Sequence, residues 1–161
     1  MNNLNGIEWY AGVKVLPRSL VLAFLLLTMS APVLALAETP VVMIKHPGQS
    51  QESLTTSVAQ RVYAMKKKVW SDGTPVVVYT LPSSSPVHRD FVQTFLKMKP
   101  HQLQRLWHRL VFSGKGDKPH LVHTMEEMLQ KVEATPGAIG YTDQQLLESS
   151  NRSVIAVSSN E

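Results

Sequence analysis

TPGAIGYT, residues 135–142, is the stretch that decides the fold of this 161-residue chain. Pro136 and Gly137 signal a turn, and the small and apolar residues that follow predict a short buried strand. Working outward from this strand, four further runs of β-branched and apolar residues predict strands. They span residues 40–45, 75–81, 120–123 and 153–158.

Helical patterns separate these strands. Apolar residues recur at helical spacing in residues 55–68 and 87–98, and residues 143–150 predict one or two further helical turns. Thr124 is followed three residues later by Glu127, a capping box that predicts another helix start. The length suits one domain. Because strands and helices alternate, we expect that domain to be a three-layer α/β fold.

The segment 101–112 carries an apolar stripe, separated from the preceding pattern by Pro100. A stripe of this width on a helix usually faces the protein core. We therefore expect Trp107 and Leu110 to be core residues and not ligand contacts. The members of the stripe are Leu103, Leu106, Trp107, Leu110 and Val111.

Residues 1–37 have the pattern of a secretory signal peptide. Lys14 and Arg18 precede the apolar stretch LVLAFLLLTM (20–29), and a small-x-small site ends at Ala37. We expect cleavage after Ala37, which leaves a periplasmic domain of residues 38–161. Residues 19–37 carry no charge, so an uncleaved inner-membrane anchor is the alternative.

The chain contains no cysteine. This excludes a disulfide framework, a thiol nucleophile and a thiolate metal site. It also excludes a lipid anchor attached to cysteine at the cleavage site. An exported chain with these properties fits the bacterial periplasm.

The net charge of the chain is +4. Without Lys14, Arg18 and Glu8, residues 38–161 keep 14 of the 16 basic and 11 of the 12 acidic residues, a net charge of +3. This mild excess suits a small anion better than a nucleic acid, which usually requires a concentrated basic face. The run 66–68 is three lysines, which we interpret as a solvated helix end, with a nucleic-acid or lipid patch as the alternative.

The stretch LPSSSPVHRDF, residues 81–91, combines serines, a proline and an arginine at a predicted helix start. A helix start exposes unpaired N–H groups at its positive end, and hydroxyls with a guanidinium complete a shell for phosphate or sulfate oxygens. The alternative is plain capping by a serine, with the arginine solvated. The candidate ligands are Ser83, Ser84, Ser85 and Arg89.

The loop FSGKGDKP, residues 112–119, is a second anion candidate through Lys115 and Lys118. It lacks the spacing and the final Lys-Ser/Thr of a Walker loop. The alternative is a mobile basic loop without a ligand.

The sequence gives little support for a catalytic site or a metal site. Six histidines are present, but no carboxylate stands at clear ligand spacing from His120 and His123. Ser84 and His88 would be neighbours on a helix, yet nothing indicates an oriented base for a serine nucleophile. We therefore expect no enzyme, no metal and no cofactor.

Several segments, taken in order, resemble the phosphate-binding family of periplasmic substrate-binding proteins, the soluble components of phosphate ABC importers. The stretches 136–141 and 107–116 are the most specific, and the resemblance covers nearly all of residues 40–158. The segments are VVMIKHP (41–47), VAQRVYAMKKKVWSDGTPVVVY (58–79), SSSPVHRDF (83–91), LQRLWHRLVFSGKGDKP (103–119) and VEATPGAIGYT (132–142).

This resemblance implies a type 2 periplasmic-binding fold, of which residues 38–161 are long enough for one lobe only. In the family, one lobe offers an arginine and a Ser-Gly-Thr helix start to phosphate, and these correspond best to Ser83, Ser84, Ser85 and Arg89. The glycine and threonine are absent here, and the arginine follows the serines. His46-Pro47 replaces the usual Asn-Pro.

Three functional hypotheses remain open from the sequence. The first is a non-enzymatic protein that binds phosphate or a similar oxyanion, in association with a membrane transporter. The second is a substrate-binding lobe without ligand that docks on an envelope partner. The third is a homodimer whose two lobes close over one ligand.

Overall fold

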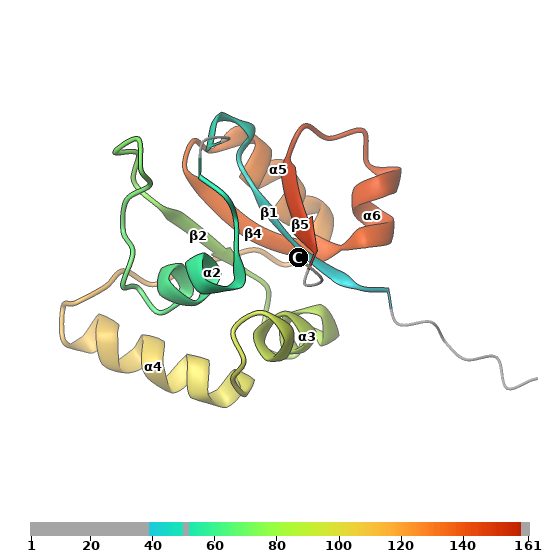
Figure 1. Ribbon diagram of the computed structural model, residues 1–161. Helices are drawn as coiled ribbons and strands as arrows, with labels where there is room; N and C mark the ends of the chain where they lie inside the picture. Colours follow the sequence, from blue (N-terminus) through green and yellow to red (C-terminus); the bar gives the residue numbers. More distant parts are fainter. Residues whose placement is uncertain (1–38, 50–51, 159–161) are drawn as a thin grey trace, which may run out of the picture. The chain divides into compact units, whose positions relative to one another are not determined.

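The computed structural model describes residues 39–49 and 52–158, so the predicted signal peptide and its cleavage site lie outside the described residues. Strand β4, Ala138–Asp143, formed by the decisive stretch, is the central strand. The sheet of the described residues has five strands in the order β3-β2-β4-β1-β5 (Figure 1). The other strands are β1 (Val41–Lys45), β2 (Val77–Thr80), β3 (His120–Leu121) and β5 (Ile155–Ser158).

The sheet is mixed. Strand β4 runs parallel to β2 and antiparallel to β1, β2 is parallel to β3, and β1 is antiparallel to β5. All five residues of β1 are buried, as expected for an inner strand covered on both faces. The predicted strands are therefore all present, with slightly different ends.

Helices cover both faces of the sheet, which confirms the predicted three-layer α/β architecture. Side chains alternate along β4, so Gly140 and Tyr141 point to opposite faces. A Cβ at Gly140 would lie 2.5 Å from Met128 of α5 (Met125–Ala134), whereas the Tyr141 ring stacks on Phe91 of α3 (Pro86–Thr94). The remaining elements are η1 (Pro47–Gln49), α2 (Thr56–Tyr63), α4 (Pro100–Phe112) and α6 (Gln144–Ser149).

Helix α2 ends earlier than the sequence predicts. It stops at Tyr63, and Met65 adopts a left-handed φ of 57°, so the lysine run 66–68 lies beyond the helix. The run is solvated in part, as predicted, since Lys66 and Lys68 are exposed, but it follows the helix instead of forming its last turn. Lys67 pairs with Glu52 at 3.1 Å and lies over the Trp70 ring at 5.9 Å, so its charge is engaged by neighbours.

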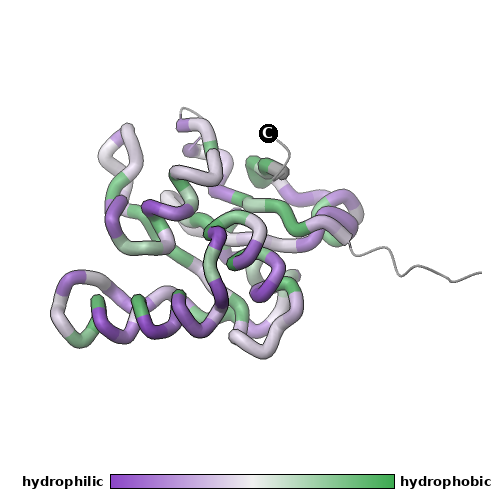
Figure 2. Tube along the Cα trace, turned by 60° about the horizontal axis from the view of Figure 1, so that its bottom comes forward, coloured by the Kyte–Doolittle hydropathy of each residue, from purple (hydrophilic) through white to green (hydrophobic). Residues whose placement is uncertain are grey.

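The apolar stripe of α4 is buried only in part. Figure 1 shows α4 along the outside of α2 and α3, and Figure 2 shows hydrophobic and hydrophilic turns alternating along it. Leu103 is fully buried, Trp107 and Leu110 are half-buried, and Phe112 is 89 % exposed. Trp107 packs against the core, as expected, and its Nε1 donates to the Tyr63 carbonyl at 2.7 Å. The prediction that Leu110 is a core residue was wrong, because α4 lies on the outside and Leu110 is not among the residues packed against the core.

Gly137 fixes the turn that starts β4. Its φ is 77°, and an added Cβ would lie 2.1 Å from the carbonyl oxygen of Pro75. Its own carbonyl accepts hydrogen bonds from Trp70 Nε1 at 2.9 Å and from the Val77 N–H at 3.0 Å. A residue without a side chain is therefore needed where the turn meets the segment leading into β2.

We predict that Gly137→Ala lowers the free energy of unfolding by about 3 kcal/mol or more, because left-handed strain and a backbone clash add together. The matched control is Gly73→Ala. Gly73 has a φ of 84° but no atom within 4 Å of an added Cβ. Its cost should be about 1–2 kcal/mol from strain alone. Urea unfolding of both variants measures the difference, and equal costs would contradict the clash.

Candidate functional site

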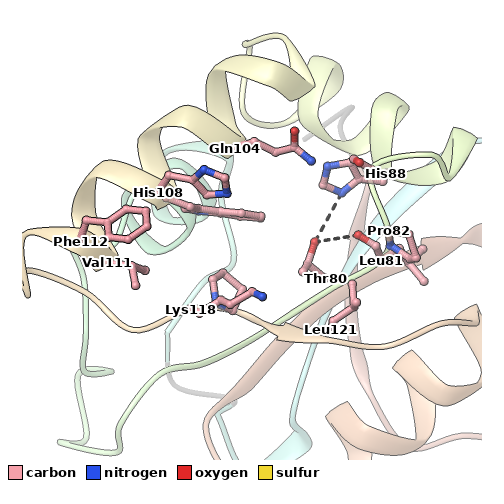
Figure 3. A pocket seen from close by; sticks show the side chains of 13 residues that line it. Thr80, Leu81, Pro82, His88, Gln104, His108, Val111, Phe112, Lys118 and Leu121 are labelled. Atoms are coloured by element: carbon pink, nitrogen blue, oxygen red, sulfur yellow. Dashed lines mark hydrogen bonds between the residues drawn. The ribbon is translucent and has the colours of Figure 1, made fainter.

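A pocket of about 600 Å³ opens beside the start of α3. Its lining comes from three places: the end of β2 with the loop 81–83, one side of α4, and the segment 118–121 that enters β3. Figure 3 shows His108, Val111 and Phe112 of α4 on one side of the space, with Thr80 and Leu121 across from them.

The hydroxyl group of Tyr141 holds the polar end of this pocket in place. It accepts a hydrogen bond from the Leu81 N–H at 2.9 Å and lies 3.1 Å from the Thr80 hydroxyl. It also lies 2.6 Å from Nδ1 of His88. One buried phenol of β4 therefore joins the end of β2 to the first turn of α3.

Aromatic packing fixes the phenol ring itself. The rings of Tyr141 and Phe91 stack with centroids 4.0 Å apart and planes 6° from parallel. Tyr63 of α2 lies 4.8 Å from Phe91 in a tilted arrangement. Pairs at these separations add roughly 0.5–1.5 kcal/mol each beyond the burial of their area. The ring therefore has little freedom to move away from the loop it holds.

His88 is a buried histidine that sequence reasoning did not assign to a site. It is 1 % exposed, and burial lowers its pKa from 6.5 to about 4, so the ring is neutral at neutral pH. The short distance to the Tyr141 oxygen favours an O–H donor, because O–H···acceptor bonds are shorter than N–H ones. With Nδ1 as acceptor, the ring proton lies on Nε2.

Nε2 of His88 has no hydrogen-bond partner among the described residues. A buried donor without an acceptor costs about 1–3 kcal/mol, so such atoms are rare away from functional sites. His88 also lines the pocket, and Figure 3 shows the Gln104 side chain of α4 pointing toward it. A signal for its burial was present in the sequence, since His88, Phe91 and Phe95 share one helical face.

The start of α3 has the geometry expected of a helix N-terminus. Ser85 is the N-cap and accepts a hydrogen bond from the His88 N–H at 3.4 Å, and Pro86 occupies the first turn. The Ser85 N–H donates to the Pro82 carbonyl at 2.9 Å, which closes a turn over Ser83 and Ser84. Both serines in that turn are exposed and available to a ligand.

The predicted anion ligands are brought together only in part. Ser83 belongs to the first predicted anion site and Lys118 to the second, and both line the same pocket. Arg89 is exposed in the first turn of α3 and has no ion-pair partner within residues 39–49 and 52–158, but it does not line the pocket. Lys115 is exposed and also lies outside the pocket lining, with its N–H bonded to the Leu110 carbonyl at 2.9 Å.

The charged side chain of Lys45 has a structural role. Its side chain is buried, and its amine donates to the backbone carbonyls of Gln49 and Glu52. Burial lowers the pKa of this amine, and the nearby charge of Glu52 acts in the opposite direction. Lys45 therefore anchors the segment after β1 and has no donor directed at the pocket.

Metal binding has no support in the part of the chain that the structure describes. Its histidine, aspartate and glutamate side chains form no group of three that could hold a metal ion. Of the described helices, none has both the length and the apolar character required to cross a bilayer.

Solved structures share the fold of this chain, although no protein-family model and no curated protein matches it. PstS from Borrelia burgdorferi is 16 % identical with a TM-score of 0.58, and the match covers 74 % of this chain and 47 % of that one. The fold is that of one lobe of a phosphate ABC substrate-binding protein. The predicted half of a type 2 periplasmic-binding protein is thereby confirmed.

Two further structures agree. A phosphate transport receptor of the ABC type from Vibrio cholerae is 14 % identical with a TM-score of 0.55, covering 74 % of this chain and 45 % of its own. A Clostridium perfringens structure with bound phosphate, assigned to the same transporter proteins, is 20 % identical with a TM-score of 0.56 and coverages of 74 % and 44 %. The chain thus spans less than half the length of these proteins, and identities this low establish the fold alone.

We predict that Tyr141→Phe lowers the free energy of unfolding by about 2–4 kcal/mol, because it leaves the buried Leu81 N–H without a partner and leaves Nδ1 of His88 with only the 3.4 Å contact to the Thr80 hydroxyl. The control is Tyr63→Phe, whose equally buried hydroxyl makes one bond, to the Tyr79 carbonyl at 3.2 Å. That change should cost about 1 kcal/mol. Chemical denaturation compares the two variants, and an equal loss would mean that the Tyr141 hydroxyl does not organise the site.

We also predict a pH dependence from His88. The unfolded chain takes up a proton below pH 6.5, whereas the folded chain resists it until about pH 4. The free energy of unfolding should therefore decrease as pH falls through this window, by up to about 3 kcal/mol. Urea unfolding at several pH values between these limits measures the slope.

The control variants for this slope are His88→Gln, which should reduce it, and His123→Gln, an exposed histidine whose loss should leave it unchanged. If His88→Gln keeps the full slope, another group is responsible for it.

Proposed function

We propose that the protein is a non-enzymatic binding protein for phosphate or a similar oxyanion. The observation that carries the proposal is the start of α3, where exposed serines precede a helix N-terminus next to a pocket that includes Lys118. Arg89, in the first turn of this helix, is exposed and has no ion-pair partner among the described residues. Helix N-termini favour anions through free N–H groups and the positive end of the dipole. The fold shared with phosphate-binding proteins supports the same ligand class.

The proposed ligands contribute in different ways. Ser83 and Ser84 offer hydroxyls and backbone N–H groups, Ser85 fixes the first turn as its cap, and Arg89 supplies a guanidinium one turn into the helix. Lys118 offers a second cation from the facing segment, whereas Lys115 is a more distant candidate. Charge-assisted bonds of this kind are about twice as strong as neutral ones.

A single lobe leaves the ligand partly open to water. The high dielectric of water weakens each charge interaction relative to a closed site. The affinity should therefore be modest, on the order of millimolar to tens of micromolar, or about 4–7 kcal/mol. It should also decrease as salt is added, as expected for exposed charges.

The cellular setting is proposed from the N-terminal sequence. Cleavage after Ala37 would release residues 38–161 into the periplasm, with an inner-membrane anchor at residues 19–37 as the alternative. In this setting the protein would associate with phosphate transport through a membrane transporter or an envelope protein. No cofactor and no nucleic acid enter the proposal.

The second candidate function is an interaction module of the cell envelope without a small ligand. It is favoured by the exposure of large apolar residues at one edge of the pocket, where Phe112 is 89 % exposed and Leu121 is 50 % exposed. Exposed apolar residues that gather in one place often mark contact surfaces. Light scattering separates this candidate from a homodimer that closes over one ligand.

We predict that Arg89→Ala weakens phosphate binding by about 1.5–3 kcal/mol, the range for hydrogen bonds to charged groups, with little change in stability. Arg89→Lys should restore part of the loss, because lysine lacks the bidentate fork. Lys131→Ala on α5, an exposed cation behind the sheet, is the control. Calorimetric titration with phosphate measures all four proteins.

Equal binding by wild type and Arg89→Ala would place the anion elsewhere, with Lys118 as the next position to change. If wild type shows no heat of binding at high millimolar phosphate, the serines are caps only and the interaction module replaces the proposed function.

A further inference from the structure

The pocket beside α3 is larger and more apolar than a phosphate ion requires. Its volume of about 600 Å³ lies in the range of sites for organic ligands, about 300–1,000 Å³. One wall consists of Trp107, Val111 and Phe112, which lie within five residues of one another on α4. Figure 3 shows Leu121 of β3 across the space from Val111 and Phe112. A bare oxyanion would leave this wall unused.

The other end of the pocket is polar and built from buried groups. His88 is 1 % exposed, lines the pocket, and has an Nε2 without a partner in the described residues. In the tautomer that the short Tyr141–Nδ1 distance favours, with Tyr141 as the donor, the ring proton lies on Nε2, which can then donate to a ligand. Gln104 is exposed, and its side chain points toward the His88 ring from α4, so it is the side chain that a ligand approaching His88 would meet.

The charge of the lining selects for an anion at the polar end. Among the described residues that line the pocket there is no aspartate or glutamate, whereas Lys118 is one of them, and Figure 3 shows its amine directed into the space toward Thr80. Within the described residues, Lys118 has no ion-pair partner. A ligand acceptor atom at Nε2 would therefore also come under the positive potential of this amine.

We propose that this pocket binds an organic oxyanion, such as a phosphonate or phosphate monoester, with its anionic end toward His88 and Lys118 and its apolar group on the wall of Trp107, Phe112 and Leu121. The inference rests on the proposed oxyanion function and specifies its substrate class. Ser83 belongs both to the pocket lining and to the turn before α3, so it connects the pocket with the proposed oxyanion site.

The test is calorimetric titration of the full-length chain with three probes: phenylphosphonate, inorganic phosphate and benzyl alcohol. Burial of a phenyl group contributes about 1.5–3 kcal/mol when complete, and each 1.4 kcal/mol is tenfold in affinity. Phenylphosphonate should therefore bind roughly tenfold or more tightly than phosphate. Benzyl alcohol, which has the ring without the charge, should bind more weakly than phenylphosphonate.

The variants Phe112→Ala and Leu121→Ala separate the apolar group from the anion. Both residues are exposed, so neither change should unfold the chain. Each should reduce the advantage of phenylphosphonate by several-fold and leave the affinity for inorganic phosphate unchanged. Val69→Ala is the matched control, because Val69 is 52 % exposed and lies outside this pocket.

Different failures have different meanings. If phosphate binds and phenylphosphonate binds no more tightly, the organic substrate class is wrong and the proposed function stands. If benzyl alcohol binds as tightly as phenylphosphonate, the anionic end is wrong. If neither anion binds, both the substrate class and the oxyanion function are overturned.

Discussion

The hydrogen bonds of the Tyr141 hydroxyl are the contacts on which the geometry of the site depends. Leu81, Thr80 and His88 all meet this one oxygen, although they belong to different elements and are 53 to 61 residues away in sequence. Leu81 follows the last residue of β2, and its N–H donates to the Tyr141 hydroxyl. Without this acceptor the N–H would be buried and unpaired, which would lower the free energy of unfolding by about 1–3 kcal/mol. The serine turn and the first turn of α3 follow directly from this anchored residue, so their position is set by a core residue of β4.

Strand β4 can perform this role only in one register. Its side chains alternate between the two helical layers, with Tyr141 facing α2 and α3 and Gly140 facing α5. A shift by one residue would exchange these faces and drive a phenol into Met128 and Val132. The turn at Gly137 prevents the shift, because its carbonyl is held by Trp70 and Val77. Local turn chemistry in PGAIGY therefore determines where a distant helix begins.

Local patterns predicted most of the fold and less of the site. The strands, the caps at Ser85 and Thr124 and the helix starts were readable because each depends on neighbouring residues. The link from Tyr141 to His88 was not, since no local pattern encodes a hydrogen bond across 53 residues. The exposure of Val111, a member of the predicted stripe, and of Phe112 beside it was not predicted, because an apolar stripe does not reveal how much of a helix its neighbours cover. The proposed contact of the pocket with the apolar group of a ligand depends on this exposure.

The proposed anion site meets the exposed apolar rim at one pocket, which Ser83 and Lys118 line together with Phe112 and Leu121, so ligand and partner binding would be physically coupled. A neutral partner covering Phe112 and Leu121 would remove water from around Lys118, and a lower dielectric strengthens its attraction for an anion. A partner that inserts a carboxylate would instead satisfy the same amine and compete with the ligand. Coupling free energies are reciprocal, so the ligand must alter partner affinity by the same factor. If both proposals hold, anion binding to this single lobe would change its affinity for a docking partner, even where its own affinity for the anion is modest.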